Sequence, residues 1–519
     1  MKARWFNVIL TLIMLAAGAA PVVTTASISA SYAAPFLEKG PQAIPASVAG
    51  PGYGLFSCQV GLSVGQCYDP YQMRHAYGID TLISAGFDGH GKTIVIVDSF
   101  QSPNIVDQLN YFDTFYGLPG LNGLGNPNDP SLGMFTQIAP DGLTPFDQND
   151  DNMVGWAEEI SLDVLWAHAI APGANIVLDL AKTNDDADIL SATKFAVDHN
   201  LGDVISQSFG EDESCVDSNL LVQEHQVFAD ATRKNITLFA SSGDEGASQA
   251  SCDGNSWGKA ASSPASDPLV TAVGGTELQA ADYCLSSLGC DPTANPAPGT
   301  YVAETAWNEG PPYGDFQDEF GSTIATGGGF SLLYDEPSYQ RSAINDINGR
   351  DNHGWHNNKG RGVPDVSYNA AVLHGVLTYL DIPGIPAGMY RFGGTSAGSP
   401  QWAAIIAIAD QKAHTRLGFI NAALYQIGQS YKNYTKSFFD VTSGTNSAVE
   451  YDADGNPITI QGFDAGPGWD ATTGLGSPST GQLVGYLIKF VSPGDGRAAI
   501  AESSPHGNGH HGHFHMGPH

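Results

Sequence analysis

The strongest constraint on the fold is the alternation of short apolar runs with amphipathic segments. Such runs predict buried strands, and the segments between them predict helices. The predicted strands are 93–97, 175–180, 203–208, 236–242 and 268–273, and the predicted helices are 104–116, 187–199 and 224–234. This alternation is typical of parallel sheets covered by helices. We therefore expect an α/β fold with a mainly parallel central sheet and helices on both faces.

Acidic residues dominate the charge of the chain. The 519 residues include 54 Asp and Glu but only 21 Lys and Arg, which gives a formal net charge of -33. This charge argues against nucleic acid or an anionic membrane as a partner. Below about pH 4 many carboxylates are protonated and their mutual repulsion decreases. The composition suits an acidic medium, although an acidic surface also fits a halophile.

The N-terminus has the pattern of a secretory signal. Lys2 and Arg4 precede an apolar segment at 6–20, and the small residues Ala33 and Ala34 offer a cleavage point. An uncleaved anchor is the alternative. We expect four segments: a signal peptide (1–34), a short leader or linker (35–57), one folded domain (58–491) and a His/Gly-rich tail (492–519). The protein would be secreted and extracellular, with no membrane contact after signal cleavage.

Six cysteines indicate disulfides in an exported chain. Fifteen pairings are possible, of which the simplest joins sequence neighbours. The neighbours are Cys58 and Cys67, Cys215 and Cys252, and Cys284 and Cys290. None has metal-ligand spacing with a nearby histidine. The histidines of the tail could bind metal weakly, but a disordered polar tail explains them as well.

A serine in a run of small residues is the first candidate for chemistry. Ser396 lies in Gly393-Gly394-Thr395-Ser396-Ala397-Gly398-Ser399-Pro400, directly before an apolar run at 402–409. A hydroxyl at a helix start meets free N–H groups, which favour developing negative charge. A serine nucleophile also needs a base. At this point catalysis and simple helix capping by Thr395 or Ser396 are both open.

Two further features carry acidic side chains. Glu159 and Asp163 are four residues apart on a predicted helix at 156–167, so they share one face. Two acids at this spacing repel one another when both are ionised, so the pKa of one of them should rise. The pair could then act as a base and the acid that supports it. Asp244 follows a predicted strand in a Gly-rich turn, where α/β active sites form. Solvated acids and a turn-stabilising Asp are the alternatives.

These features occur in the order typical of one family. From about Tyr68 to Leu487 the chain resembles the sedolisins, serine-carboxyl peptidases with a subtilisin-like fold. The matching segments are 77–79, Glu159 with Asp163, 242–244, 265–275, 326–331, 361–366, 394–400 and 466–470. The resemblance implies that residues 58–491 form a peptidase domain that acts on protein or peptide substrates. It also implies a secreted serine-type endopeptidase that is active in acid, and we expect a monomer.

The resemblance assigns four catalytic roles. It implies that Ser396 is the nucleophile, Glu159 the general base, Asp163 its support and Asp244 the oxyanion stabiliser. A histidine is mostly protonated at pH 4, whereas a carboxylate can still accept a proton. Asp244 would stay protonated in order to donate a hydrogen bond to the oxyanion. Asp98 is a weaker candidate, as an acid hydrogen-bonded to Glu159.

The resemblance also implies one bound Ca²⁺ near the C-terminus. Asp440 and Asp470 would bind through their side chains, and Val441, Gly466 and Gly468 through carbonyl oxygens. Carboxylate and carbonyl oxygens are the ligands that Ca²⁺ prefers.

Two rival interpretations stay open. A subtilisin-type protease would use Asp98, a histidine and Ser396, with His75, His90, His168, His199 and His225 as candidates. It lacks the His-Gly-Thr segment expected downstream and leaves Glu159 and Asp163 unexplained. An inactive, calcium-bound secreted binding module is the second rival. Family members usually carry a long folded propeptide. Here about twenty residues separate the predicted signal from Cys58, so the segment from Pro35 is expected to be a remnant leader.

Overall fold

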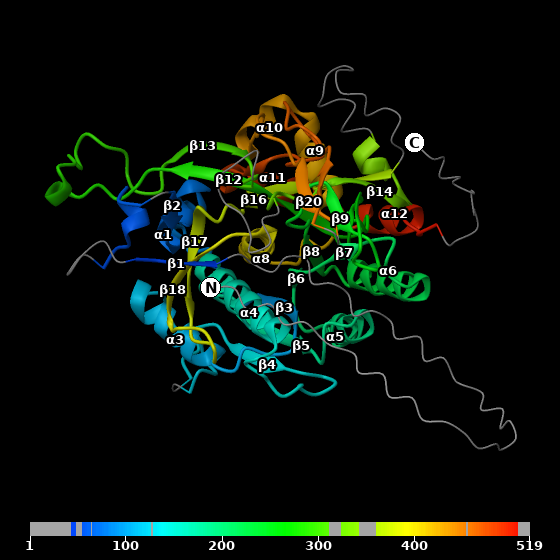
Figure 1. Cartoon of the computed structure of the whole chain (residues 1–519), viewed down its shortest axis with the longest axis horizontal. Coiled ribbons are helices and arrows are strands. Elements are labelled where there is room, and N and C mark those ends of the chain that lie inside the picture. Colours follow the sequence, from blue (N-terminus) through cyan, green and yellow to red (C-terminus); the bar gives the residue numbers. More distant parts are fainter. Residues whose placement is uncertain are drawn as a thin grey trace, which may run out of the picture. The chain divides into compact units, whose positions relative to one another are not determined.

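The central element of the computed structural model is a sheet of eight strands, counted over the described residues (Figure 1). The structure describes residues 43–47, 54–63, 65–125, 128–310, 323–341, 360–452 and 455–506. The strand order is β13-β12-β8-β6-β3-β5-β4, and β16 also pairs with β12. The strands are β3 (Thr93–Ser99), β4 (Phe135–Ile138), β5 (Asn175–Ala181), β6 (Val204–Gln207), β8 (Thr237–Ser241), β12 (Thr271–Ala280), β13 (Tyr301–Ala306) and β16 (Val366–Asn369). All pairings in it are parallel except that of β13 with β12.

Helices cover both faces of this sheet, as the sequence predicts. Side chains alternate along a strand. Ile94 and Ile96 of β3 therefore enter a core formed with helices α4 (Asp151–Ile170) and α8 (Gly398–Ala413). Val95 and Val97 enter a second core with α5 (Asp186–Asp198) and α6 (Ser218–Arg233). The expected α/β class with a mainly parallel sheet is confirmed.

The remaining helices and strands surround this three-layer body. The helices are α1 (Pro70–Ala76), α2 (Ile79–Ser84), α3 (Ile105–Tyr116), α9 (Asn421–Gln429), α10 (Tyr431–Ser437), α11 (Thr480–Phe490) and α12 (Asp495–Glu502). Short helical turns are η1 (Ser57–Gln59), η2 (Ser286–Leu288) and η4 (Thr395–Ala397). A separate four-stranded sheet has the order β1-β18-β17-β2 and comprises β1 (Ala43–Pro45), β18 (Gly388–Phe392), β17 (His374–Leu380) and β2 (Gln66–Tyr68). Paired short strands are β7 (Glu211–Asp212) with β11 (Ser262–Ser263), β9 (Ser248–Ala250) with β10 (Trp257–Lys259), β14 (Gly329–Asp335) with β15 (Gly360–Val363), β19 (Phe438–Phe439) with β22 (Ser477–Pro478), and β20 (Ala448–Tyr451) with β21 (Pro457–Ile460).

Structure extends beyond both ends of the expected domain. The expected leader contains strand β1, and the expectation of a loose tail from residue 492 is wrong for α12. Helix α12 packs on α6, with Ala499 buried in the second core. A Cβ built on Gly496 would lie 2.6 Å from Thr232, so this glycine allows the close approach. The predicted signal peptide and the histidines from His510 onward lie outside the described residues.

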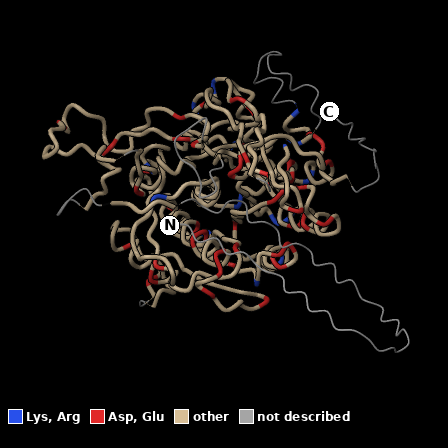
Figure 2. The backbone as a smooth tube through the Cα atoms, viewed as in Figure 1, with Lys and Arg blue, Asp and Glu red and all other residues tan. Residues whose placement is uncertain are grey.

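The cysteines form three disulfides between sequence neighbours: Cys58–Cys67, Cys215–Cys252 and Cys284–Cys290. Within the described ranges, none of the helices combines the length and hydropathy needed to cross a membrane. Acidic positions are spread over the described chain, whereas Lys and Arg are sparse (Figure 2). The excess of acid is therefore a property of the whole fold and not of one patch.

Candidate active site

Ser396 lies at the turn between strand β18 and helix α8. Residues 393–394 lead into η4, which runs directly into α8, and Ser396 is 8% exposed. Gly394 has a φ of 111°, and a Cβ there would lie 2.6 Å from Oδ2 of Asp244. Only glycine meets both conditions without strain. The local sequence therefore fixes a tight turn that presents a serine at a helix N-terminus.

Glu159 and Asp163 lie on the inner side of α4 and contact this turn. Glu159 is 3% and Asp163 0% exposed, so the interpretation of both as solvated surface acids is wrong. The Ser396 hydroxyl donates a hydrogen bond to the Glu159 carboxylate. A further hydrogen bond joins Glu159 to Asp163, which requires a proton on one of the two carboxyl groups. The structure thus brings together the three residues that the sequence paired only by pattern.

Burial sets the proton affinity of this pair. Burial raises the pKa of Glu159 well above its ordinary value, and the charges of Asp163 and Asp98 raise it further. The hydrogen bond from Ser396 acts in the opposite direction. Burial also raises the pKa of Asp163 to about 8, against hydrogen bonds from Ser208 and Glu159 that lower it. The raised pKa values belong to the coupled pair, which keeps one shared proton to higher pH than exposed carboxyl groups do and leaves one negative charge to accept the hydrogen bond from Ser396.

Asp244 contacts the nucleophile turn from the end of strand β8. Its Oδ1 accepts hydrogen bonds from the Thr395 backbone N–H at 2.7 Å and from the Thr395 hydroxyl at 2.8 Å. Its charge also reaches Glu159, whose pKa it raises. Asp244 is 3% exposed. Its carboxyl group therefore holds the turn that carries Ser396, and it is not limited to stabilising its own Gly-rich turn.

Asp98 lies close to the pair but is not bonded to it. The side chain is completely buried at the end of β3. Burial and then the charge of Asp163 raise its pKa well above the ordinary value. Neither carboxyl oxygen has a hydrogen-bond partner in the described part of the chain, so the expected bond to Glu159 is not formed.

Ser208 is a contact that the sequence did not single out. Its hydroxyl donates to Oδ2 of Asp163 at 2.7 Å, and both side chains are buried. Asp98, Ser208 and Asp244 end or follow three neighbouring parallel strands, β3, β6 and β8. Polar residues at the carboxyl ends of parallel strands gather at one edge of a sheet. That rule could have identified Ser208.

The histidines considered as bases have other ring contacts. His75 pairs with Asp80, and His225 pairs with Asp267. The His168 ring contacts Asp113 and the Pro119 carbonyl. The His199 ring contacts the Phe195 carbonyl. For His90 the recorded contact is a backbone one, from its N–H to Asp88. None of these contacts involves Ser396, so the geometry gives no support to a histidine base.

The predicted calcium ligands lie together near the C-terminus. Oδ1 of Asp440 accepts a hydrogen bond from the Gly468 N–H at 3.0 Å, and Oδ2 of Asp470 accepts one from the Gly466 N–H at 2.9 Å. Burial raises both carboxyl pKa values, that of Asp470 to about 7. The carbonyl oxygens of Val441, Gly466 and Gly468 accept no hydrogen bond from a described residue. Carbonyls without donors beside two carboxyl groups, the buried one of Asp470 and the exposed one of Asp440, fit a hard cation.

A cluster of three or more His, Cys, Asp or Glu side chains suited to a metal is absent from the described residues. The predicted calcium site does not need one, because it supplies two carboxylates and three carbonyls. Asp440 also accepts a hydrogen bond from the Tyr434 hydroxyl at 2.8 Å.

Comparison with known proteins gives the family. No family model matches the chain. The chain is 30% identical to kumamolisin from Bacillus sp. (strain MN-32) over 441 residues, which cover 85% of this chain and 67% of kumamolisin. It is 30% identical to sedolisin from Pseudomonas sp. (strain 101) over 371 residues, 70% of this chain and 54% of sedolisin. The chain thus spans about two thirds of the first relative and about half of the second.

A solved structure agrees with these relatives. Pseudomonas sedolisin, a serine-carboxyl proteinase complexed with two molecules of pseudo-iodotyrostatin, superimposes with a TM-score of 0.62 at 27% identity. The match covers 82% of this chain and 99% of that structure. Fold and relatives together define a serine-type peptidase with a subtilisin-like architecture. The chain belongs to the sedolisin family.

Proposed function

We propose that the chain is a secreted endopeptidase that cleaves peptide bonds in acidic medium, with Ser396 as nucleophile and Glu159 as general base. The observation that carries the proposal is the hydrogen bond from Ser396 to the buried Glu159. A serine nucleophile requires such a proton acceptor. The fold and the relatives support a peptidase, and the contacts among Ser396, Glu159, Asp163 and Asp244 support these four roles.

The chemistry follows from these contacts. Ser396 Oγ attacks the carbonyl carbon of the substrate while its proton passes to Glu159. The carbon–nitrogen bond then breaks, and Glu159 returns the proton to the leaving amine. Water, deprotonated by Glu159, attacks the acyl-enzyme and releases the acid and free Ser396. Asp163 shares a proton with Glu159 and holds it toward the serine.

Asp244 would stabilise the oxyanion of each tetrahedral intermediate. A protonated carboxyl group donates a hydrogen bond to the oxyanion, whereas an ionised one repels it. Its Oδ1 is already engaged by Thr395, which holds the group against the nucleophile turn. The N-terminus of α8 favours the same negative charge. This arrangement predicts that activity falls when Asp244 ionises.

We also propose that one Ca²⁺ stabilises the C-terminal region. Asp440 and Asp470 would bind it through carboxylates, and Val441, Gly466 and Gly468 through carbonyl oxygens. The ion would link the segment around residue 440 to the loop at 466–470 and would neutralise two carboxylates, of which that of Asp470 is buried. It takes no part in the chemistry at Ser396.

The test is hydrolysis of an unfolded protein at pH 4 by the wild type and by Ser396→Ala. We expect the variant to fold, with an unchanged melting temperature, and to lose cleavage by at least about 10³-fold. Ser399→Ala is the matched control, since Ser399 lies on the same helix but is bonded to Ser206 at 2.8 Å. Undiminished hydrolysis by Ser396→Ala would refute the assignment of the nucleophile.

A further inference from the structure

A pocket lies where helix α12 packs against the C-terminal end of α6 (Figure 1). Its volume is about 220 Å³. Gly496 allows the two helices to approach, since a Cβ there would lie 2.6 Å from Thr232 and 3.3 Å from Phe419. Helix α12 follows residue 487, where the resemblance to the sedolisins ends. This cavity, called the α12 pocket below, is therefore closed by a part of the chain on which the family resemblance does not rest.

Packing fixes the inner wall of the α12 pocket. Thr232, Leu417 and Phe419 line it, and all three are buried. The Leu417 N–H donates to Oδ1 of Asp410 at 2.7 Å, and the Phe419 ring packs edge-on against that of Tyr339. The inner wall is therefore preformed. A preformed site lowers the entropy cost of binding a ligand, because few side chains must be ordered.

Two arginines line the outer part of the same pocket. Arg233 is the last residue of α6, Arg497 lies in the first turn of α12, and both are exposed. The chain has only 21 Lys and Arg against 54 Asp and Glu, so two guanidinium groups at one pocket are unusual for this surface. Positive charge in a concave site attracts an anion. The lining also includes Asn235, Ser492, Pro493 and Ile500.

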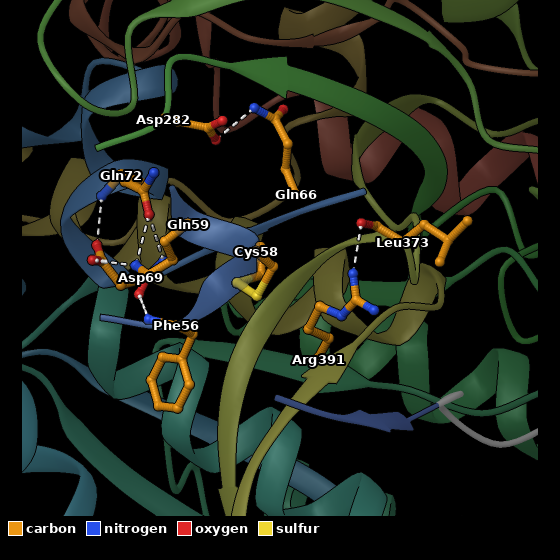
Figure 3. The surroundings of a disulfide bond; sticks show 10 residues. Phe56, Cys58, Gln59, Gln66, Asp69, Gln72, Asp282, Leu373 and Arg391 are labelled. Atoms are coloured by element: carbon orange, nitrogen blue, oxygen red, sulfur yellow. Dashed lines mark hydrogen bonds between the residues drawn. A yellow bond between two sulfur atoms is a disulfide. The ribbon is translucent and has the colours of Figure 1, made fainter. Parts of the chain in front are cut away.

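The guanidinium groups of the α12 pocket have donors available for a ligand. By contrast, Arg391 of β18 donates to the Leu373 carbonyl at 3.3 Å (Figure 3). Among the residues that the structure describes, none pairs with Arg497 or accepts a hydrogen bond from it. Arg233 pairs with Asp230 through Nη1 at 2.5 Å, which leaves its Nε and Nη2 donors. An anion in the pocket could therefore accept hydrogen bonds from both arginines.

The lining indicates which kind of anion fits. The planar fork of a guanidinium matches the two oxygens of a carboxylate. The apolar side chains of Leu417, Phe419 and Ile500 suit an apolar group next to that carboxylate. An α-carboxyl group has a pKa of about 3.3 to 3.7, below the usual values of side-chain carboxyl groups, so it is still ionised in mildly acidic medium.

We propose that the α12 pocket binds an α-carboxylate next to an apolar side chain, with the two arginines on the carboxylate and the apolar wall around the side chain. Two sources share this chemistry, the C-terminus of a peptide and a free N-acylated amino acid. Binding at this pocket uses none of the residues assigned to catalysis. The proposal therefore goes beyond the proposed function and does not depend on it.

The test is titration calorimetry at pH 5 with the full chain in a Ser396→Ala background, so that no probe is hydrolysed. Two probes are acids, N-acetyl-leucine and acetyl-Ala-Ala-Leu, and two are the corresponding amides, which lack the charge. We expect each acid to bind at least tenfold more tightly than its amide. Equal binding of acids and amides would overturn the proposal. Tighter binding of the tripeptide acid would identify a peptide C-terminus as the ligand, and equal or tighter binding of N-acetyl-leucine would identify the free acid.

Substitutions locate the binding. Arg497→Gln and Arg233→Gln each remove one guanidinium, so each should weaken binding of the acids at least fivefold and leave that of the amides unchanged. Lys436→Gln is the matched control, because it removes one positive charge from an exposed position on α10 and should bind like the parent. Acid binding that either arginine variant keeps in full, or that the control loses equally, would overturn the α12 pocket as the site. Melting curves check that each variant is folded.

Discussion

Two clusters of acidic side chains in this protein each contain carboxyl groups with raised pKa values, and the clusters differ in their neighbours. The catalytic cluster consists of Asp98, Glu159 and Asp163. The remote cluster consists of Asp186, Glu211, Glu224 and Asp267 with His225. Burial raises the pKa of Glu211 to about 9 and that of Glu224 to about 8, much as it raises that of Asp163 to about 8.

The surroundings separate the two clusters. In the remote cluster His225 pairs with Asp267 at 2.7 Å, and the charge and hydrogen bond of Asp267 raise the histidine pKa against the effect of burial. Serine hydroxyls donate to acids in both clusters: Ser396 to Glu159 and Ser208 to Asp163 in the catalytic one, and Ser263 to Glu224 at 3.2 Å in the remote one. A raised carboxyl pKa beside a serine is therefore no sign of catalysis by itself. The distinguishing feature of Ser396 is its place in a glycine-rich turn at the N-terminus of α8.

Matched substitutions in the two clusters should have the most unequal effects. Glu159→Gln removes the proton acceptor of Ser396, so we expect peptidase activity at pH 4 to fall by at least about 10³-fold. Glu224→Gln, in the remote cluster, should keep activity within about twofold of the wild type. Initial rates on one substrate, with melting curves for both variants, measure this. Equal losses would show that the two clusters are functionally alike.

Ser208 sharpens the comparison within the catalytic cluster. Its hydrogen bond lowers the pKa of Asp163, so Ser208→Ala should raise that pKa and move the acid limb of the pH–rate profile to higher pH. We expect kcat to fall by about tenfold, which corresponds to about 1.4 kcal/mol. Ser208→Thr keeps the hydroxyl and should restore the wild-type limb. A profile displaced equally by both variants would indicate a packing effect.

Both clusters should make the fold more stable in acid. Glu159 and Asp163 in the catalytic cluster, and Glu211 and Glu224 in the remote one, bind protons more tightly in the folded than in the unfolded chain. Their contribution is therefore complete below pH 4 and is lost as the pH rises through about 8 to 9. The raised pKa of His225 acts in the same direction. We expect a melting temperature at least about 5 °C higher at pH 4 than at pH 8.

Substitutions separate the two contributions to this pH dependence. Asp163→Asn and Glu224→Gln each remove one group that titrates in this range, so each should narrow the difference between pH 4 and pH 8. A melting temperature that rises from pH 4 to pH 8 in the wild type would contradict the pKa directions. If only one of the two variants narrows the difference in melting temperature between pH 4 and pH 8, the cluster that it changes is the main source of the pH dependence.

Calcium should have the smallest effect and the opposite pH dependence. Burial raises the pKa of Asp470 to about 7, and that of Asp440 is also raised, so both ligands ionise more fully as the pH rises. Excess chelator at pH 7 should lower the melting temperature by a few degrees, since ligand at 100 times its Kd stabilises by about 2.7 kcal/mol. The Asp470→Asn variant should not respond to chelator. A wild-type melting curve that excess chelator does not change would contradict the proposed calcium site.

The sequence predicted correctly those strands and helices whose apolar periodicity is visible in a short stretch of residues. The apolar run at 93–97 became the buried strand β3, and the four-residue spacing placed Glu159 and Asp163 on one helix face. Boundaries set by capping were less accurate: α6 begins at Ser218, after the N-cap Asp217, and not near residue 224. Strand β1 and helix α12 were missed because their stability comes from distant partners, β18 and α6.

The candidate active site likewise has residues that a short stretch of sequence indicates and contacts that it does not. Glycine-rich turns and acid spacing indicated Ser396, Glu159 and Asp244 from sequence. The position of Ser208 at the end of a strand could have marked it as a site residue, but its bond to Asp163 joins residues 45 positions apart in the chain, so local sequence does not show the partner. The remote cluster was not anticipated either, because four separate segments (α5, β7, α6 and the segment between β11 and β12) contribute its acids to one place in the fold.

The most direct test of the central claim is the rate of protein hydrolysis from pH 2 to pH 9, for the wild type and for Asp244→Asn. A carboxyl base with a protonated Asp244 predicts a wild-type maximum in acid and a decline toward neutrality. An asparagine side chain donates a hydrogen bond at any pH, so the variant, although slower, should keep its activity to higher pH. A wild-type maximum near pH 8 would contradict the account and return the role of base to a histidine.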